Sequence, residues 1–168
     1  MLQSSWMESV QIVPYEIEQH PWAARLLEQR WGGTQIVSRG RVHQAERLPG
    51  FAALRDDQPA GLVTYNIFNN ECEIVSLDSL YEGRGVGSAL VGAVIELAMR
   101  QNRRRVWLIT TNDNLPALRF YQKRGFKLTA VYPNALEISR KLKPQIPLTG
   151  LDGILLRDEI ELEYPLSS

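Results

Sequence analysis

Three glycines at alternating positions form the part of this chain best suited to hold a charged ligand. Gly83, Gly85 and Gly87 stand between an apolar, strand-like run at 74–80 and an apolar, helix-like run at 86–99. Because glycine has no Cβ, such a turn can bend tightly and bring its backbone close to a ligand. The helix that follows directs its first free N–H groups at the turn, where they can bind phosphate oxygens. The segment therefore predicts a site for a phosphate or pyrophosphate group.

The turn by itself leaves other interpretations open. Its Gly-x-Gly-x-Gly spacing at 83–87 fits neither the dinucleotide-binding fingerprint nor the triphosphate-binding loop, which ends in Gly-Lys followed by Ser or Thr. It could be a tight strand-to-helix connection without a ligand. It could also belong to a nucleotide-binding α/β domain that holds another phosphate compound.

A second polar turn lies further downstream and leads into a short helical pattern. Residues 112–114 offer helix-capping side chains, and Pro116 suits an early helical position. Ala117 and Tyr121 then fall on one helical face. Gly125 is placed to end the helix. The pattern predicts a capped helix with a tyrosine on its functional face.

Together the two segments resemble the GNAT superfamily of acetyl-CoA-dependent N-acyltransferases. In that family the pattern Gln/Arg-x-x-Gly-x-Gly/Ala lies on a pyrophosphate-binding turn and precedes the pattern Asn-x-x-Ala-x-x-x-Tyr-x-x-x-Gly-Phe. The second pattern is matched in full, by Asn114, Ala117, Tyr121, Gly125 and Phe126. The first is matched at Gly85 and Gly87, whereas Glu82 stands where Gln or Arg is usual. The resemblance covers residues 9–165.

The resemblance implies that acetyl-CoA lies along the strand before the turn and on the turn itself. The backbone at 77–79 would hydrogen-bond the acetyl carbonyl and the pantetheine amides. Glu82 places an acidic side chain near the pyrophosphate, and Arg84 would compensate for it. Asn114 would bind the pantetheine arm, or would only cap its helix. The residues implied to bind acetyl-CoA are Leu77, Asp78, Ser79, Glu82, Gly83, Arg84, Gly85, Val86, Gly87, Ser88, Asn114, Ala117 and Tyr121.

Acetyl transfer to an amine also needs a proton donor for the leaving thiolate. We interpret Tyr121 as this general acid, because a phenol of pKa ~10 can donate to a thiol of pKa ~8.5. The alternative is that Tyr121 only packs, with its hydroxyl bonded to backbone.

The proton of the acceptor ammonium, whose pKa is ~10.4, needs a base. Glu71 and Glu73 precede the turn on one strand and, being two residues apart, share a face. Members of the family often place a catalytic glutamate on this strand, and Glu71 has the best-matching offset from Leu77. A solvated pair at an exposed strand start is the alternative, and Asp78, on the opposite face, is a weaker candidate.

The remaining reactive side chains are given structural interpretations. His20 is expected at the surface or as a capping residue at a helix start, and His43 is expected at the surface, although it could touch the substrate. Cys72 points away from its glutamate neighbours and is expected to pack in the core. The arginines at 103–105 are interpreted as a solvated helix–strand junction, and contact with the 3′-phosphate of coenzyme A is the alternative.

Composition indicates one domain over residues 1–168, with 44% apolar and 23% charged residues and a formal net charge of zero. Zero net charge argues against nucleic acid or an anionic membrane as partner. One cysteine and two histidines argue against a metal site. No stretch reaches the ~20 apolar residues of a membrane helix, and no signal-peptide pattern begins the chain. A cytoplasmic monomer or homodimer is expected.

The surrounding elements predict an α/β (α+β) fold, and the resemblance implies a mixed, mostly antiparallel twisted central sheet flanked by helices. Strands are expected at 10–15, 51–55, 62–68, 71–80, 105–110, 126–132 and 154–164, and helices at 21–31, 86–100 and 115–124. Residues 35–44 are expected to be extended. Residues 133–153 are expected to form a loop with a short amphipathic helix at 134–144.

The resemblance implies an N-acyltransferase that moves the acetyl group of acetyl-CoA to a primary amine by direct attack in a ternary complex. The acceptor is expected to be a small amine, a peptide N-terminus or a lysine, bound by residues 21–44 and 133–153. The alternative is an acetyl-CoA-binding sensor or partner-binding module without catalysis.

Overall fold

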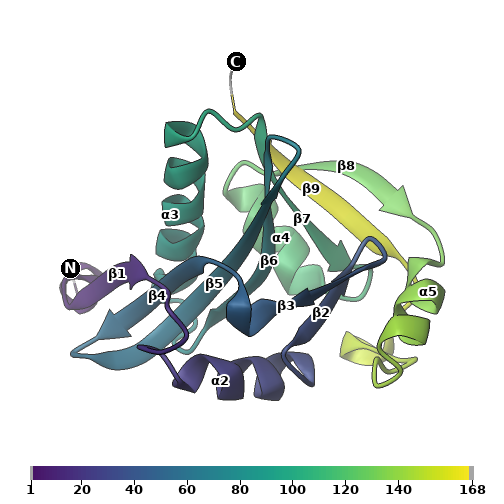
Figure 1. Ribbon diagram of the computed structural model, residues 1–168, viewed down its shortest axis with the longest axis horizontal. Coiled ribbons are helices and arrows are strands. Elements are labelled where there is room, and N and C mark those ends of the chain that lie inside the picture. Colours follow the sequence, from purple (N-terminus) through teal and green to yellow (C-terminus); the bar gives the residue numbers. More distant parts are fainter. Residues whose placement is uncertain (1, 167–168) are drawn as a thin grey trace.

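A seven-stranded sheet forms the centre of the computed structural model, which describes residues 2–166 (Figure 1). Its strand order is β1-β4-β5-β6-β7-β9-β8. The strands are β1 (Val10–Pro14), β4 (Gly50–Arg55), β5 (Gln58–Phe68), β6 (Glu71–Ser79), β7 (Arg105–Thr111), β8 (Lys127–Tyr132) and β9 (Glu159–Pro165). Neighbouring strands pair antiparallel except β6 and β7, which are parallel. The predicted mixed, mostly antiparallel sheet is confirmed.

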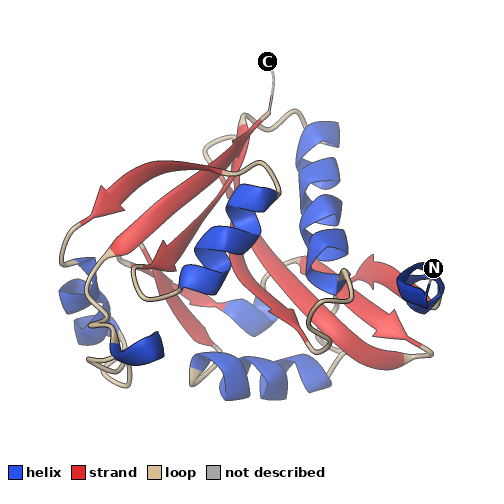
Figure 2. Cartoon of the chain, turned by 180° about the vertical axis from the view of Figure 1, so that it is seen from behind, coloured by secondary structure: helices blue, strands red, loops and turns tan. Residues whose placement is uncertain are grey.

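Helices and a small hairpin cover both faces of this sheet. The helices are α1 (Leu2–Glu8), α2 (Trp22–Trp31), α3 (Val86–Arg100), α4 (Leu115–Lys123) and α5 (Ala135–Leu142), with short 3₁₀ turns η1 (Ala45–Arg47) and η2 (Leu151–Gly153). Strands β2 (Gln35–Ser38) and β3 (Arg41–Gln44) form the hairpin. Seen from behind, α3 and α4 lie across the sheet and α2 runs below it (Figure 2).

Alternate residues of β5 join two separate hydrophobic clusters, because successive side chains of a strand point to opposite faces. Val63 is fully buried in the cluster that contains Leu90 and Val94 of α3. Leu62 is fully buried in the cluster that contains Leu26 and Leu27 of α2. The two helices are therefore held on opposite faces of the same sheet.

Strand β6 separates from β7 halfway along its length. The two strands pair only from Cys72 to Ile74. At the same height the register with β5 shifts, because Tyr65 pairs with Ile74 and Thr64 pairs with Ser76. Val75 is the extra residue of this β-bulge, and a bulge bends its strand. Within the described chain, residues 77–79 therefore have no strand partner on the β7 side, and their backbone groups on that side are left for a ligand.

Most predicted elements are confirmed, including α3 with both of its predicted ends. Helix α1 was not predicted. The last strand was predicted from 154, and this start is wrong. Thr149 and Leu155 form a separate bridge, and Asp158 accepts a hydrogen bond from the backbone N–H of Asn134 at 2.9 Å. Local contacts thus hold residues 154–158 away from the sheet.

The single cysteine is buried as predicted, and burial raises the pKa of the Cys72 thiol to about 12. A surface position was predicted for His43 and, as one of two alternatives beside helix capping, for His20, and it is wrong for both. His20 is buried with its Nδ1 3.0 Å from the carbonyl oxygen of Glu16, and His43 is buried beside Glu73. No helix in residues 2–166 has the length and apolarity to cross a membrane.

Candidate functional site

The glycine turn and the start of α3 line a cavity of about 700 Å³, here called the turn cavity. Gly83 and Gly85 have φ angles of +71° and +92°, in the left-handed region that favours glycine. Gly85 is also the N-cap of α3 and brings no side-chain acceptor to it. The first N–H groups of the helix therefore stay available to an anion. Gly87 is needed for a different reason, because a Cβ there would lie 3.2 Å from the ring of Phe120.

Every residue expected to bind acetyl-CoA lines the turn cavity except Asn114. The Asn114 side chain caps α4, because its Oδ1 accepts a hydrogen bond from the backbone N–H of Ala117 at 3.1 Å. Asn114 lines a second cavity instead. The structure thus gathers segments from β6, the turn, α3 and α4 around one space.

Three arginines line the turn cavity, Arg30, Arg84 and Arg124, and the last two lie beside the glycine turn and the start of α3. Arg84 is exposed on the turn, with its guanidinium 5.7 Å from the ring centre of Trp6. Arg124 follows α4 and donates to Ser88 Oγ at 2.7 Å, while its guanidinium lies 3.5 Å from the ring centre of Phe120. Arg124 was not predicted as a site residue. Both guanidinium groups can offset the charge of Glu82, which lines the same cavity.

Tyr121 presents a buried phenol to the turn cavity. Its ring makes edge contacts with Phe120 and Phe126, at centroid distances of 5.0 and 5.2 Å. Burial and the nearby charge of Asp78 raise the pKa of Tyr121, so its hydroxyl keeps its proton. The Asp78 carboxylate is itself held by Trp31, whose Nε1–H donates to it at 2.9 Å.

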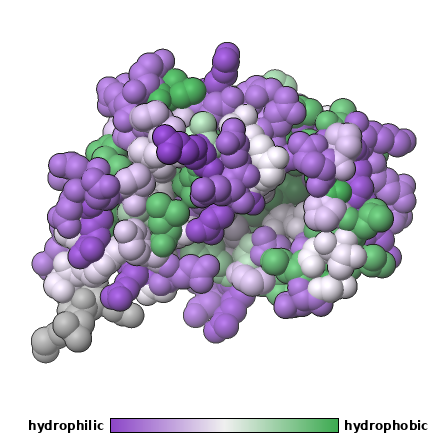
Figure 3. Space-filling view, turned by 90° about the horizontal axis from the view of Figure 1, so that it is seen from below, coloured by the Kyte–Doolittle hydropathy of each residue, from purple (hydrophilic) through white to green (hydrophobic). Residues whose placement is uncertain are grey.

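A second cavity of about 430 Å³, here called the carboxylate pocket, lies among α2, the β2–β3 hairpin, β7 and α5. In the view from below it opens as a hollow with apolar walls (Figure 3). Two buried carboxylates, Glu73 and Glu159, line it. Arg30 lines both this pocket and the turn cavity. The two spaces therefore adjoin where β6 leaves β7.

Glu73 is a buried carboxylate with a pKa near neutrality. Ser38 Oγ donates to Glu73 Oε1 at 2.5 Å, and His43 Nε2 lies 3.6 Å from Oε2. Burial raises the pKa of Glu73 to about 7, and the charges of Glu159 and Glu161 act in the same direction. Ser38 and Arg41 oppose this rise without cancelling it. At neutral pH the group can both accept and release a proton.

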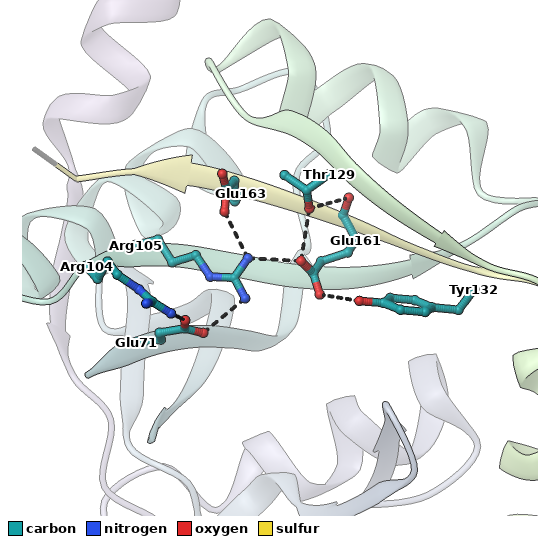
Figure 4. Close-up of polar contacts among 7 residues, drawn as sticks. All are labelled: Glu71, Arg104, Arg105, Thr129, Tyr132, Glu161 and Glu163. Carbon is teal, nitrogen blue, oxygen red and sulfur yellow. Dashed lines mark hydrogen bonds and ion pairs between the residues drawn. The ribbon is translucent and has the colours of Figure 1, made fainter. Parts of the chain in front are cut away.

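Glu71, two residues away on the same strand, has the opposite environment (Figure 4). Arg105 pairs with its Oε2 at 3.0 Å, and Arg104 pairs with Oε1. Partial burial alone would raise the pKa of Glu71, but hydrogen bonds from these arginines outweigh it and lower the pKa. Arg105 also binds Glu161 and Glu163, each at 2.9 Å. Glu71 is therefore held ionised within a structural ion-pair network.

The arginines at 103–105 were interpreted as a solvated junction, and this is wrong for Arg105, which is only 19% exposed at its side chain. They follow the C-terminal end of α3, whereas the glycine turn precedes its N-terminal end. Helix α3, with 15 residues, separates these arginines from the glycine turn by about 22 Å.

The comparisons with known proteins identify the family. Residues 5–126, which include both motifs and both glutamates of β6, match the family model of the Acetyltransferase (GNAT) family. The chain belongs to this family. Bacillus subtilis YdhI is 46% identical to this GNAT protein over 131 residues, which are 77% of this chain and 82% of YdhI.

Solved structures share the fold of this GNAT protein along nearly its whole length. An IAA acetyltransferase from Bacillus cereus has a TM-score of 0.73 and 21% identity, and the match covers 94% of this chain and 100% of that one. A Bacillus subtilis acetyltransferase in complex with CoA has a TM-score of 0.68 and 20% identity, covering 94% and 99%. The chain is therefore a GNAT-type N-acetyltransferase in fold and family.

Several residues of the candidate site were not predicted from the sequence. They are Trp31, Ser38, Lys143 and Glu159, all of which line the carboxylate pocket. Glu159 and Glu161 alternate with Ile160 and Leu162, and that alternation predicts an outward polar face. The glutamates are buried because arginines of other elements, Arg39 and Arg105, pack against them. A run of three alternating glutamates in a central strand was the signal available.

Proposed function

We propose that this GNAT protein transfers the acetyl group of acetyl-CoA directly to a primary amine while both substrates are bound. One observation carries the proposal. Tyr121, a phenol that could donate a proton, lines the turn cavity; Glu73, a carboxylate that could accept one, lines the carboxylate pocket; and the two spaces adjoin at the separated edge of β6.

The coenzyme fits the turn cavity through complementary groups. Its pyrophosphate would bind the free N–H groups at the start of α3, where the helix dipole favours an anion. Arg84 and Arg124 add full positive charges. The pantetheine arm would then run along residues 77–79, whose backbone offers hydrogen bonds on the side that faces away from β5. This places the thioester near the bulge at Val75.

Glu73 is the base in this proposal, and Glu71 is not. The acceptor enters as an ammonium ion and must lose a proton before it can attack. A carboxylate with a pKa of about 7 is matched to this task at neutral pH. Glu71 has a lowered pKa and each of its oxygens is paired with an arginine, so it is a weaker proton acceptor.

The reaction balances with four proton transfers, the last of which returns the proton taken up by Glu73 to the solvent. Glu73 takes one proton from the ammonium, and the neutral nitrogen attacks the thioester carbon. As the new C–N bond forms and the C–S bond breaks, Tyr121 donates its proton to the leaving sulfur. The nitrogen loses a second proton on becoming an amide, and this proton restores Tyr121. The raised pKa of Tyr121 keeps its hydroxyl protonated between turnovers.

The test begins with calorimetric titration of acetyl-CoA, with ATP and NAD as controls. Selective micromolar binding of acetyl-CoA is expected, followed by amine-dependent release of the coenzyme thiol. The acetylated amine is identified by mass spectrometry. Binding of ATP or NAD in preference to acetyl-CoA would overturn the proposal, and so would a lack of turnover with every amine offered.

A further inference from the structure

We infer that the acceptor of this enzyme is a small primary amine with an apolar body, bound in the carboxylate pocket and recognised without a carboxylate of its own. This inference rests on the function proposed above and deepens it. It is carried by the way the side wall of the carboxylate pocket is built, and by the distribution of charge on its walls. The pocket is a hollow that is open on one side (Figure 3), and it is closed only along the wall that Lys143 completes.

A buried lysine closes the pocket on the side away from β6. Lys143 follows α5, and its Nζ donates to the carbonyl oxygens of Trp31 and Gln35 at 2.6 and 2.7 Å. The side chain is 5% exposed. Hydrogen bonds from a charged donor are the stronger kind in proteins. This lysine bridge joins the end of α5 to the connection between α2 and β2, over more than 100 residues of sequence.

The segment after α5 is also tied down at other points. Asp113, which is buried after β7, accepts a hydrogen bond from the backbone N–H of Leu151 at 2.8 Å. Arg140 donates to the carbonyl oxygen of Pro147 at 2.9 Å and to that of Leu156. These contacts hold in place the part of the pocket wall formed by residues 143, 145–147 and 156.

The carboxylates and the apolar side chains that line the pocket lie in different parts of it. Glu73, together with Glu159, which Arg39 partly neutralises at 3.4 Å, supplies negative charge at one end, where an ammonium would bind. Apolar side chains supply much of the remaining wall, among them Ile36, Leu136 and Ile146. Burial of an apolar body against them is favourable by the hydrophobic effect. The pocket therefore matches a molecule that is cationic at one end and apolar at the other.

The cations of the pocket are placed where they do not bind an acceptor carboxylate. Lys143 is committed to two backbone carbonyls. Arg30 stands at the border with the turn cavity, next to the coenzyme site, and reaches the carbonyl oxygen of Ser79 at 3.5 Å. An amino acid or peptide would bring polar main-chain groups against an apolar wall, and unpaired buried polar groups are costly. At about 430 Å³ the pocket has the size of a small-molecule site.

The experiment compares three acceptors that share one aromatic group and one primary amine. They are 2-phenylethylamine, phenylalanine and a hexapeptide that begins with phenylalanine, with spermidine as a polar amine. We expect kcat/KM for 2-phenylethylamine to exceed that for each of the others at least tenfold. Equal or better use of the hexapeptide, of phenylalanine or of spermidine overturns the inference. So does failure to acetylate 2-phenylethylamine when acetyl-CoA binds.

The proposed function fails separately from this inference. Acetylation of the hexapeptide or of spermidine alone leaves acetyl transfer established and rejects only the apolar acceptor. Absence of acetyl-CoA binding in the calorimetric titration rejects the proposed function itself. The two results cannot be confused, because the titration contains no acceptor.

The lysine bridge is tested with Lys143→Met, and Lys141→Met, an exposed position of the same helix, is the matched control. Loss of the bridge opens the wall, so the preference for 2-phenylethylamine over the hexapeptide is expected to fall at least threefold. The control is expected to keep the wild-type preference. An unchanged preference in a folded Lys143→Met protein overturns the role of the bridge.

If circular dichroism shows that Lys143→Met does not fold, Ile146→Ala takes its place. This change shortens an apolar wall residue without touching the bridge. KM for 2-phenylethylamine is expected to rise about tenfold relative to that for ethylamine, as lost methylene contacts in a pocket predict. Equal changes for the two amines would show that the apolar wall does not select the acceptor.

Discussion

The turn cavity and the carboxylate pocket are built from the chain in different ways. The turn cavity takes most of its lining from two short stretches, 77–88 and 116–124. The carboxylate pocket takes its lining from α2, the hairpin, β6, β7, α5 and β9. The first is a local structure that one sequence motif can encode. The second exists only when six elements are packed together, so it is the region in which relatives of the same fold can differ most freely.

The two glutamates of β6 show the same contrast on a smaller scale. Glu71 and Glu73 have the same residue type, the same strand and the same strand face. Glu71 meets two arginines and has a lowered pKa, whereas Glu73 is buried with Ser38 and has a pKa of about 7. Their neighbours from distant segments, and not their sequence positions, decide which one can act as a base.

The largest expected effect tests the carboxylate pocket. Glu73→Gln removes the base, and kcat/KM is expected to fall by about 10²–10³-fold. Acetyl-CoA affinity should be unchanged, because Glu73 does not line the turn cavity. In the wild type, kcat/KM should decrease as the pH falls through about 7, where Glu73 becomes protonated.

The matched control is Glu71→Gln, which should keep the midpoint of the pH–rate profile near 7. A profile that shifts with Glu71→Gln and not with Glu73→Gln would exchange the roles of the two glutamates. Steady-state kinetics between pH 5 and 9 provide the measurement.

The second-largest effect is expected for Tyr121, the proposed proton donor in the turn cavity. Tyr121→Phe is expected to lower kcat about 10–100-fold, because the leaving thiolate loses its proton source. The affinity for acetyl-CoA should stay close to that of the wild type. Tyr65→Phe, a buried tyrosine that lines neither cavity, is the control and should keep kcat. An unchanged kcat in Tyr121→Phe, with chemistry limiting the rate, would remove this residue from the acid role.

A substitution in the glycine turn should weaken the binding of acetyl-CoA without affecting the chemical step. Gly85→Val places a β-branched residue at a φ of +92°, which costs ~1–3 kcal/mol of backbone strain. We expect the Kd of acetyl-CoA in calorimetry to rise roughly 10-fold. Gly92→Val, at an open position of α3, is the control and should bind normally. Normal binding by Gly85→Val would mean that the turn does not hold the coenzyme.

The smallest effect concerns stability. The pKa of Glu73 rises from its ordinary 4.5 to about 7 on folding, so the folded state binds the proton more tightly. This contribution to stability is present below pH 4.5 and is lost as the pH rises through about 7. Glu73→Gln has no titrating group at this position. The melting temperature of the variant, relative to that of the wild type, should therefore be higher at pH 8 than at pH 5. Calorimetric melting that shows the same difference at both pH values would contradict the buried titration.

Much of the fold could be predicted because local signals agreed with one another. Strand-like runs flanking the turn residues at 56–59 predicted β4 and β5, and the glycine turn predicted the start of α3. The polar turn with Pro116 marked α4. The start of β9 was missed because Leu155 and Leu156 continue the apolar pattern, while contacts made by residues 149 and 158 remove that segment from the sheet. Helix α1 was missed because its short sequence shows no cap or strong period.

The sequence by itself determined the family, the mixed sheet and most of the residues that surround the turn cavity. These depend on glycines, caps and periodic patterns, whose physical effect is exerted over a few neighbouring residues. Only the tertiary structure decided the environment of each carboxylate, the burial of His43 and the closure of the pocket by Lys143. Such properties depend on which distant groups remove water or supply charge, and the pairing of Lys143 with Trp31 and Gln35 exists only after the chain has folded.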